Sequence, residues 1–208
     1  MIKNKPIIVN MLAGPGAGKS TGAYYITGIL KNLGVRAELV TEYAKDKVWE
    51  KNAQIFAFQA TLFGKQVYRI GRVADPEHDV KVIVTDSPLI LSALYNKDEV
   101  LGDNFNQCVV DTFNSYDNLN CFITRIKAYD HKGRWQNEEE AKECDKILQD
   151  VLHDFNVDYD FFNGDLTGYN QIIECILRKL GMNDAIRYIV LFSSAVQKFL
   201  LEYHSIEV

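Results

Sequence analysis

The chain has few cysteines, four in 208 residues, and their placement excludes the common metal and disulfide frameworks. No two cysteines form a Cys-x-x-Cys pair, and none has a histidine at metal-ligand spacing. The histidines (His78, His131, His153 and His204) show no ligand spacing either. We therefore expect reduced thiols that pack as small core residues, as in a cytoplasmic protein. The cysteines are Cys108, Cys121, Cys144 and Cys175.

Long hydrophobic runs are also missing. Near the C-terminus the longest apolar stretch is Tyr188–Phe192, far short of the roughly 20 residues that a membrane helix needs. The apolar run after Lys3 and Lys5 is too short for a signal peptide, and glycine and proline follow it at once. We expect no membrane partner and a cytoplasmic location.

Positive charge is not in excess, because the formal net charge is −5. The surface as a whole should not attract nucleic acid, so any polyanion would have to meet a local basic patch. Hydrophobic residues make up 47% of the chain, which is enough for a sizeable core. The length favours one domain.

What the chain does contain is a regular alternation of strands and helices. The continuous apolar run Pro6–Ala13 predicts a strand buried on both faces. Asn137 and Glu140 have the spacing of a capping box, which predicts the start of a helix. Together the segments predict a parallel sheet with helices on both faces. The other expected strands are Val35–Thr41, Val80–Thr85, Asn120–Ile126 and Asp158–Asn163, and the helices are Lys19–Leu33, Ala53–Val73, Pro88–Tyr95, Phe105–Ser115, Asn137–His153 and Tyr169–Leu180.

Residues 182–208 lie outside this alternating pattern. A broad apolar stripe predicts one further helix there, which either packs on the core or builds a homodimer. We therefore expect a main domain over residues 1–181 and a C-terminal helical extension over residues 182–208.

The stretch LAGPGAGKST, residues 12–21, joins the first strand to the first helix. A strand, a glycine-rich loop and a Lys-Ser pair that opens a helix form the pattern of a phosphate-binding loop. Its backbone N–H groups and the helix N-terminus attract a phosphate. Lys19 would contact the β- and γ-phosphates of ATP, and Ser20 would bind Mg²⁺. The residues expected to surround the nucleotide are Gly14, Gly16, Ala17, Gly18, Lys19, Ser20 and Thr21, with Thr21 near the α-phosphate.

This loop departs from the strict pattern at its first glycine, where Ala13 stands. Alanine stays small but does not reach positive φ as easily as glycine. We expect Gly14 to supply the turn instead. A glycine-rich turn that binds nothing is the alternative, which the flanking strand and helix disfavour.

Asp86 ends the apolar strand in the stretch VKVIVTDSP. A carboxylate at the carboxyl edge of a strand beside the phosphate loop can hold Mg²⁺, directly or through water. The alternative is a helix cap, because Asp86 or Ser87 before Pro88 is suitable N-cap chemistry. The two roles are compatible.

Glu42, in the stretch LVTEYAKD, follows the second strand at the same edge of the sheet. There it can orient an acceptor hydroxyl or take its proton. The alternatives are a solvated loop glutamate or an ion pair with Lys45. Tyr43 and Trp49 either form the wall of a site for a base or serve only in packing.

Two basic stretches stand out in this acidic chain. The first carries Lys65, Arg69 and Arg72, and the second carries Arg125, Lys127, Lys132 and Arg134. We expect the second to form a lid over about residues 127–137, in which Arg125 and Arg134 neutralise the transferred phosphoryl group. A solvated basic face is the alternative.

With these motifs the chain resembles P-loop kinases, over about residues 5–180. The likeness is greatest to the AAA-like kinases of tailed phages, whose relatives include nicotinamide riboside and deoxynucleoside kinases. It is carried by LAGPGAGKST, LVTEYAKD, VTDSPL and RIKAYDHKGRWQNEEEA. The resemblance implies a three-layer α/β P-loop fold with strand order 2-3-1-4-5, and Glu42 as base near aromatic Trp49. Deoxynucleoside kinases have arginine where Ser87 follows Asp86, so that motif does not carry over.

These observations together predict an ATP-dependent, Mg²⁺-requiring kinase. Lys19, Glu42, Asp86, Arg125 and Arg134 are the expected catalytic residues. The acceptor is a hydroxyl of a nucleobase or nucleoside. Because some phage members of the group phosphorylate it, the hydroxymethyl group of 5-hydroxymethyluracil in DNA is the specific candidate. The alternatives are a nucleoside or nucleoside-monophosphate kinase, and a nucleotide-binding regulatory ATPase without an acceptor.

Overall fold

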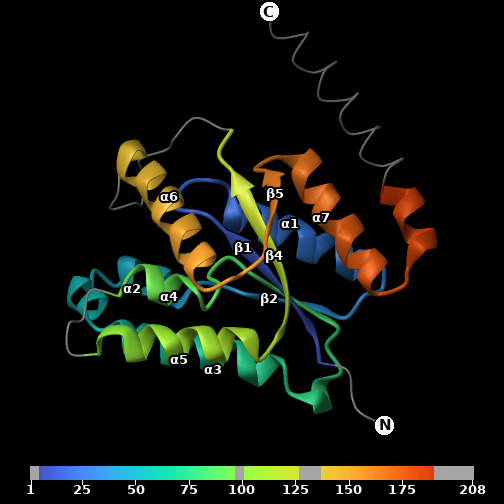
Figure 1. The fold of residues 1–208 in the computed structure, drawn as a ribbon. Coiled ribbons are helices and arrows are strands. Elements are labelled where there is room, and N and C mark those ends of the chain that lie inside the picture. Colours follow the sequence, from blue (N-terminus) through green and yellow to red (C-terminus); the bar gives the residue numbers. More distant parts are fainter. Residues whose placement is uncertain (1–4, 97–100, 127–136, 190–208) are drawn as a thin grey trace, which may run out of the picture.

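The computed structural model describes residues 5–96, 101–126 and 137–189. Its centre is a five-stranded parallel sheet in the order β2-β3-β1-β4-β5, as predicted. All four strand pairs are parallel, and β1 runs between β3 and β4 (Figure 1). The strands are β1 (Ile7–Leu12), β2 (Ala37–Val40), β3 (Val82–Thr85), β4 (Asp117–Thr124) and β5 (Asp160–Asn163).

The central strand β1 is buried at all six positions, which explains its continuous apolar sequence. Its side chains alternate between the two faces of the sheet. Val9 and Met11 join one core cluster, whereas Ile8 and Leu12 join the other. This period of two divides the core into two layers, one on each side of the sheet.

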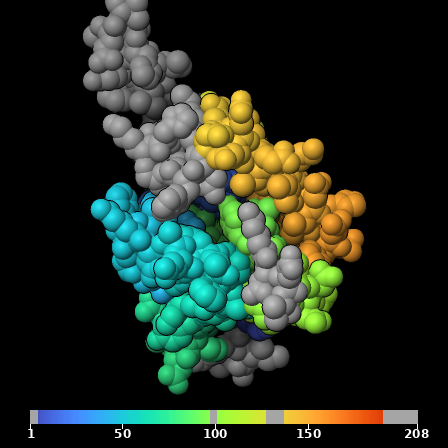
Figure 2. All heavy atoms as spheres, turned by 90° about the vertical axis from the view of Figure 1, so that its left-hand side faces the viewer, coloured from blue at the N-terminus to red at the C-terminus, as the bar shows by residue number. Residues whose placement is uncertain are grey.

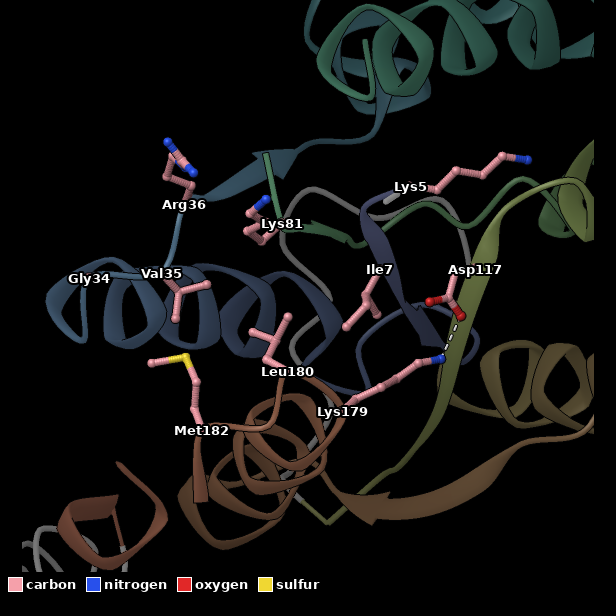
Figure 3. Close-up of a pocket in the computed structure, with 10 residues that line it drawn as sticks. All are labelled: Lys5, Ile7, Gly34, Val35, Arg36, Lys81, Asp117, Lys179, Leu180 and Met182. Carbon is pink, nitrogen blue, oxygen red and sulfur yellow. Dashed lines mark hydrogen bonds and ion pairs between the residues drawn. The ribbon is translucent and has the colours of Figure 1, made fainter. Parts of the chain in front are cut away.

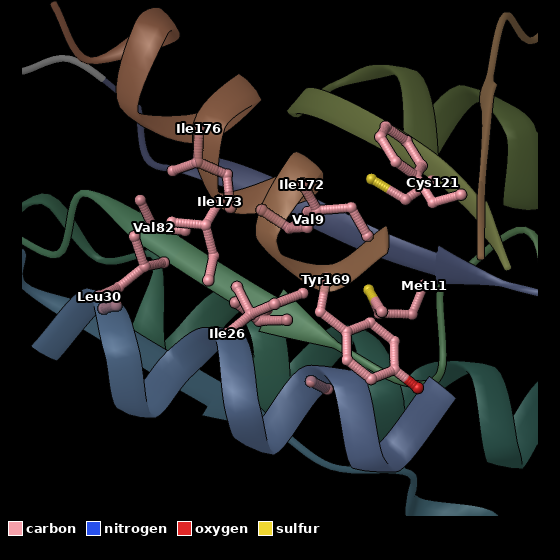
Figure 4. Close-up of a cluster of buried hydrophobic side chains, with 14 of the residues drawn as sticks. Val9, Met11, Ile26, Leu30, Val82, Cys121, Tyr169, Ile172, Ile173 and Ile176 are labelled. Atoms are coloured by element: carbon pink, nitrogen blue, oxygen red, sulfur yellow. The ribbon is translucent and has the colours of Figure 1, made fainter. Parts of the chain in front are cut away.

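Helices cover both faces of the sheet, which gives three layers. On one face α1 (Lys19–Asn32) and α7 (Leu166–Lys179) pack their isoleucines and leucines against β1 and β3 (Figure 4). On the other face the helices are α3 (Gln59–Val73), α4 (Leu91–Leu94), α5 (Gly102–Asn114) and α6 (Glu138–Asp154). The predicted capping box at the start of α6 is present, with Asn137 and Glu140 bonding each other's backbone. Gly34 after α1 and Gly181 after α7 have positive φ.

The predicted helix Ala53–Val73 is wrong as a single element. A 3₁₀ turn over Ala53–Ala57 precedes α3, and Phe58 separates them with non-helical φ and ψ. The Gln59 side chain donates to the carbonyl of Phe56 at 3.1 Å. In a continuous α-helix that carbonyl would accept from the next turn, so the side-chain bond competes with helix propagation.

Two shorter elements also differ from the sequence prediction. Only Leu91–Leu94 of the expected helix Pro88–Tyr95 is α-helical. The residues before it form turns, in which each N–H bonds the carbonyl three residues earlier. A helix that the sequence did not predict, α2 (Tyr43–Trp49), follows β2 directly. The boundaries of the remaining elements shift by a few residues.

The start of the C-terminal extension packs on the main core. Residues 183–189 are helical, and Ile189 is buried in the α1–α7 layer, where Met182, Ala185 and Ile186 also pack. Residues 190–208 lie outside the described part of the chain, so a homodimer through the extension stays a prediction. In the described residues no helix is both long and apolar enough to cross a membrane.

Candidate nucleotide and catalytic site

The phosphate loop lies between β1 and α1, at the carboxyl edge of the sheet. Its positive φ angles occur at Gly16 (82°) and Gly18 (102°), so the expectation that Gly14 supplies the turn is wrong. Gly14 instead lacks a side chain because helix α6 is close. A Cβ atom there would lie 2.5 Å from the carbonyl oxygen of Ala141. Ala13 is buried in the core next to it.

The second half of the loop packs equally closely. A Cβ atom on Gly18 would lie 2.5 Å from the Tyr169 hydroxyl, which donates to the Gly18 carbonyl at 2.9 Å. A Cβ atom on Gly164 would lie 2.4 Å from the carbonyl oxygen of Ala17. Segments far along the chain thus fix the loop from both sides. Thr21 is exposed in the first turn of α1.

Lys19 reaches back over the loop. Its Nζ donates to the carbonyl oxygens of Ala13 and Gly14, both at 2.7 Å. Burial lowers the pKa of the Lys19 ammonium, and the nearby carboxylates of Glu42 and Asp86 oppose this shift. The ammonium group therefore lies among the predicted site carboxylates.

Ser20 and Asp86, the two predicted magnesium ligands, contact each other. The Ser20 hydroxyl donates to Asp86 Oδ2 at 2.5 Å, and Asp86 is buried. Hard oxygen donors of this kind suit Mg²⁺. The helix-cap alternative is wrong, because the N-cap of α4 is Ile90 and neither Asp86 nor Ser87 caps it.

Glu42 is the N-cap residue of α2, without a side-chain capping bond. Its backbone N–H donates to Asp86 Oδ1 at 3.1 Å, which joins the Glu42 segment to the Asp86 carboxylate. Burial raises the pKa of the Glu42 carboxyl; Asp86 adds to the shift and Lys19 opposes it. Among the described ion pairs none joins Glu42 to Lys45.

Two side chains of α3 hold the backbone on either side of Glu42. The buried Gln66 accepts from the N–H of Tyr43 at 3.1 Å and donates to the carbonyl of Thr41 at 3.4 Å. Arg69 donates to the same carbonyl at 3.1 Å and pairs with Asp46. Arg69 therefore does not belong to a purely solvated basic face, although the sequence allowed that reading. The Gln66 contact was not predicted.

Arg125 lies directly after β4, with its side chain only 8% exposed. It pairs with Asp145 of α6 at 2.8 Å and donates to the carbonyl of Pro15 at 2.5 Å. Its predicted contact with the transferred phosphoryl group stays a prediction. Arg134 and the rest of residues 127–136 lie outside the described part of the chain. Asp145 belongs to the site but was not predicted.

Tyr95 is a further group that sequence reasoning missed. It follows α4, and Cys144 of α6, Glu42 and Asp145 are its neighbours in the site. Burial raises the pKa of Tyr95, so the phenol keeps its proton at neutral pH. A donor hydroxyl thus lies near the carboxylates of the site.

The surface is hollowed beside these residues. Figure 2 shows the hollow between the cyan segment that contains α2, the green segment near α4 and the gold start of α6. Trp49 is 73% exposed at the end of α2. The ring of Tyr43 is covered by Lys47 and Arg69, each 5.1 Å from its centroid. Whether either aromatic contacts an acceptor stays a prediction.

A separate groove of about 710 Å³ lies at the opposite end of the sheet (Figure 3). It adjoins the amino ends of the strands, near Ile7 and Asp117, whereas ligands of open α/β sheets bind at the carboxyl ends. Its cations contact neighbouring groups: Lys5 bonds the Ser115 carbonyl, Lys179 pairs with Asp117, and Arg36 and Lys81 pair with Asp79. We therefore do not assign the nucleotide to this groove.

Comparison with known proteins agrees with this geometry. Residues 9–166 match the family described as an AAA domain. The chain belongs to this family. The match includes the phosphate loop, Glu42, Asp86 and Arg125, so it shows a P-loop nucleotide-binding domain. A search among curated proteins found no match.

Solved structures of NadR protein share the fold of this AAA domain. One, in complex with NR, has a TM-score of 0.62 and 17% identity over 84% of this chain. Another, in complex with NAD and AMP-PNP, has a TM-score of 0.62 and 16% identity over 86% of this chain. This chain spans about half the length of each of these two NadR chains, 51% in both cases. At this identity the similarity concerns the fold alone.

Proposed function

We propose that this protein is an ATP-dependent kinase that transfers the γ-phosphate to a hydroxyl of a nucleobase or nucleoside acceptor. One observation carries the proposal: Lys19, Ser20, Asp86 and Glu42 converge at the end of β1. A nucleotide switch needs the first three. Such a switch does not need the fourth, Glu42, a half-buried carboxylate whose neighbours Thr41 and Tyr43 are held by α3.

In the proposed reaction, the acceptor oxygen forms a bond to the γ-phosphorus while the bond from that phosphorus to the β,γ-bridging oxygen breaks. The electron pair leaves with ADP, and Glu42 takes the acceptor proton. Lys19 balances negative charge on the β- and γ-phosphates. The backbone N–H groups of the loop bind the phosphate oxygens. The positive φ of Gly18 keeps these N–H groups aligned.

Ser20 and Asp86 would hold Mg²⁺ in this proposal. Their oxygen atoms, Ser20 Oγ and Asp86 Oδ2, are 2.5 Å apart and are the ligand type that suits this ion. The ion neutralises phosphate charge when it is bound. Asp86 also fixes the Glu42 backbone through Oδ1, so one carboxylate links the phosphate side of the site to the acceptor side. Arg134 stays the proposed lid residue over the transferred group.

For the acceptor, we propose a base or nucleoside that enters the hollow beside α2 and α4. The exposed Trp49 and the protonated Tyr95 support a planar, hydrogen-bonding acceptor. The NR complex of a fold relative also favours this class. We retain 5-hydroxymethyluracil in DNA as the specific candidate and a free nucleoside or nucleoside monophosphate as the alternative.

The test is a label-transfer assay. The protein is incubated with Mg²⁺, γ-labelled ATP and separate acceptors: free nucleosides, nucleoside monophosphates, and DNA with or without hydroxymethylated pyrimidines. The proposal predicts label on one acceptor, on hydroxymethylated DNA if the specific candidate is right. Release of labelled phosphate with no labelled acceptor would favour the regulatory ATPase instead.

A further inference from the structure

Asp145 of α6 uses both carboxylate oxygens at the phosphate loop. Its Oδ1 accepts from the backbone N–H of Gly14 at 2.5 Å, and its Oδ2 accepts from Arg125 Nη2 at 2.8 Å. Arg125 Nη1 in turn donates to the carbonyl of Pro15 at 2.5 Å. Gly14, Asp145, Arg125 and Pro15 therefore form a closed ring of hydrogen bonds.

The ion pair in this ring is well shielded from water. The side chains of Arg125 and Asp145 are 8% and 17% exposed. Removing one partner of a buried pair leaves an uncompensated charge, so such a pair restricts the positions of both partners strongly. A surface ion pair would not hold a backbone in this way.

The position of the pair in the chain is also informative. Arg125 directly follows β4 and comes just before residues 127–136, and Asp145 lies in α6, the helix that follows them. Arg125 Nη2 also contacts the carbonyl of Ala141 at 3.5 Å. The elements before and after the predicted lid, β4 and α6, are therefore both linked to the first half of the phosphate loop, through Arg125 and Asp145.

We propose that Arg125 and Asp145 are positioning residues that hold Gly14 and Pro15 in the shape that binds the triphosphate. The proposal rests on the proposed nucleotide site and assigns Arg125 to the loop rather than to the transferred phosphoryl group. We call the pair the loop strap. Its physical basis is the Ala13–Gly14 peptide, whose N–H (on Gly14) donates to Asp145 while its carbonyl (on Ala13) accepts from Lys19.

Loss of the strap frees the Ala13–Gly14 peptide to rotate. The carbonyl that orients Lys19 then loses its fixed position, and the ammonium group is less well aligned for phosphate. The cost falls on nucleotide affinity and is small for chemistry after binding. A group that contacts only the transferred phosphoryl would show the reverse, a loss in kcat with affinity retained.

The test measures the affinity for Mg-ATP by calorimetry in Asp145→Ala, Arg125→Met and the double variant. We expect each single change to weaken binding about tenfold or more, a loss of about 1.4 kcal/mol. The double variant should bind Mg-ATP no more weakly than the weaker-binding of the two single variants, because each single change already breaks the same ring of hydrogen bonds. Asp145→Asn should fall between wild type and Asp145→Ala, since its Oδ1 still accepts from Gly14.

Asp150→Ala is the matched control, because it removes an exposed carboxylate from the same helix, and it should bind as wild type does. Thermal unfolding of each variant is measured alongside. If Asp145→Ala does not fold, Asp145→Asn and Arg125→Lys supply the comparison.

Three outcomes separate the possibilities. Wild-type protein that does not bind Mg-ATP contradicts the proposed function itself. Wild-type binding with unchanged affinity in Asp145→Ala and Asp145→Asn overturns the loop strap alone. Lost turnover with unchanged affinity in Arg125→Met also overturns the strap and returns Arg125 to the transferred phosphoryl group.

Discussion

Burial and neighbouring charges shift the pKa values of two residues of the site, Lys19 and Glu42. Lys19 is buried among carboxylates, and burial lowers its pKa, whereas burial and Asp86 raise the pKa of Glu42. A raised carboxyl pKa brings a base closer to neutral pH, where proton transfer is most effective. The same burial that would suit Glu42 to the proposed proton transfer makes its charged form costly for folding.

For Glu42 we expect Glu42→Gln to lower kcat by about 10²–10⁴-fold, because the amide cannot take the acceptor proton. The affinity for Mg-ATP should change little, since Lys19 and Ser20 remain. Steady-state kinetics with the labelled acceptor and calorimetry separate the two quantities. Unimpaired transfer in this variant would remove Glu42 from the mechanism.

Glu42→Gln should also change stability with a defined pH dependence. A carboxyl with a raised folded-state pKa holds protons more tightly folded than unfolded, so its contribution to stability falls as pH rises above the ordinary value of 4.5. The glutamine variant escapes this loss. Its melting temperature should exceed that of wild type at pH 7, and the difference should vanish near pH 4. A lower melting temperature at pH 7 would contradict the raised pKa.

Gly18 should tolerate no side chain. Gly18→Ala would force an L-residue to φ 102° and place its Cβ atom 2.5 Å from the Tyr169 hydroxyl. We expect a loss of about 1–3 kcal/mol in the free energy of unfolding, measured with urea. Gly28 lies within α1, the helix that follows Gly18, and a Cβ atom there meets nothing within 4 Å, so Gly28→Ala should gain about 0.5–1 kcal/mol.

At the scale of elements, helix α3 sets the position of the β2–α2 junction. Gln66 uses both ends of its amide on Thr41 and Tyr43, the neighbours of Glu42. Arg69 adds a third contact, on Thr41. The orientation of the proposed base therefore depends on a helix that contributes no group to the chemistry itself.

Gln66→Leu should lower kcat by about tenfold or more through loss of this support, with nucleotide affinity unchanged. Thr61→Ala is the matched control, because Thr61 is an exposed residue of the same helix. The comparison requires both kcat and the dissociation constant for Mg-ATP. Equal losses in the two variants would show that α3 acts on the site only through general stability.

Sequence patterns predicted the elements whose signals are local. The apolar run of β1 and the Asn137–Glu140 capping box each lie within a few residues, and the structure contains both. The break at Phe58 was missed because one side-chain bond to a carbonyl decides it. Helix α2 was missed because seven residues give too little periodicity.

In the site, too, the residues with local sequence motifs were predicted and those placed by long-range packing were not. Lys19, Ser20 and Asp86 come from motifs at strand ends, and the sheet brings them together as the sequence predicted. Asp145 reaches Gly14 across 131 positions of sequence, so its contact exists only once α6 has packed. Packing contacts of this kind leave no periodic or motif signal in a single sequence.

At the scale of the whole molecule, the net charge of −5 opposes a polyanionic acceptor. If DNA is nevertheless the substrate, local phosphate contacts must supply the affinity, and salt weakens such contacts steeply. A target base inside a duplex would also have to leave the stack, at a cost of about a few kcal/mol. The salt dependence of transfer therefore distinguishes a DNA acceptor from a free nucleoside.

Transfer to DNA should fall steeply between about 50 and 200 mM salt, by several orders of magnitude if many phosphates are contacted. Transfer to a free nucleoside should change only a few-fold over the same range. The kcat/KM of each acceptor, measured at matched ATP concentration, checks this. A flat response with a DNA acceptor would contradict recognition through phosphate contacts.

The central claim is that Lys19, Ser20 and the loop amides bind a magnesium triphosphate. Calorimetric titration of wild type and Lys19→Met with Mg-ATP tests it most directly. We predict saturable binding to wild type and at least a roughly hundredfold weaker affinity in the variant, a difference of about 2.8 kcal/mol. Absence of binding to wild type, or equal affinity in both proteins, would contradict the claim.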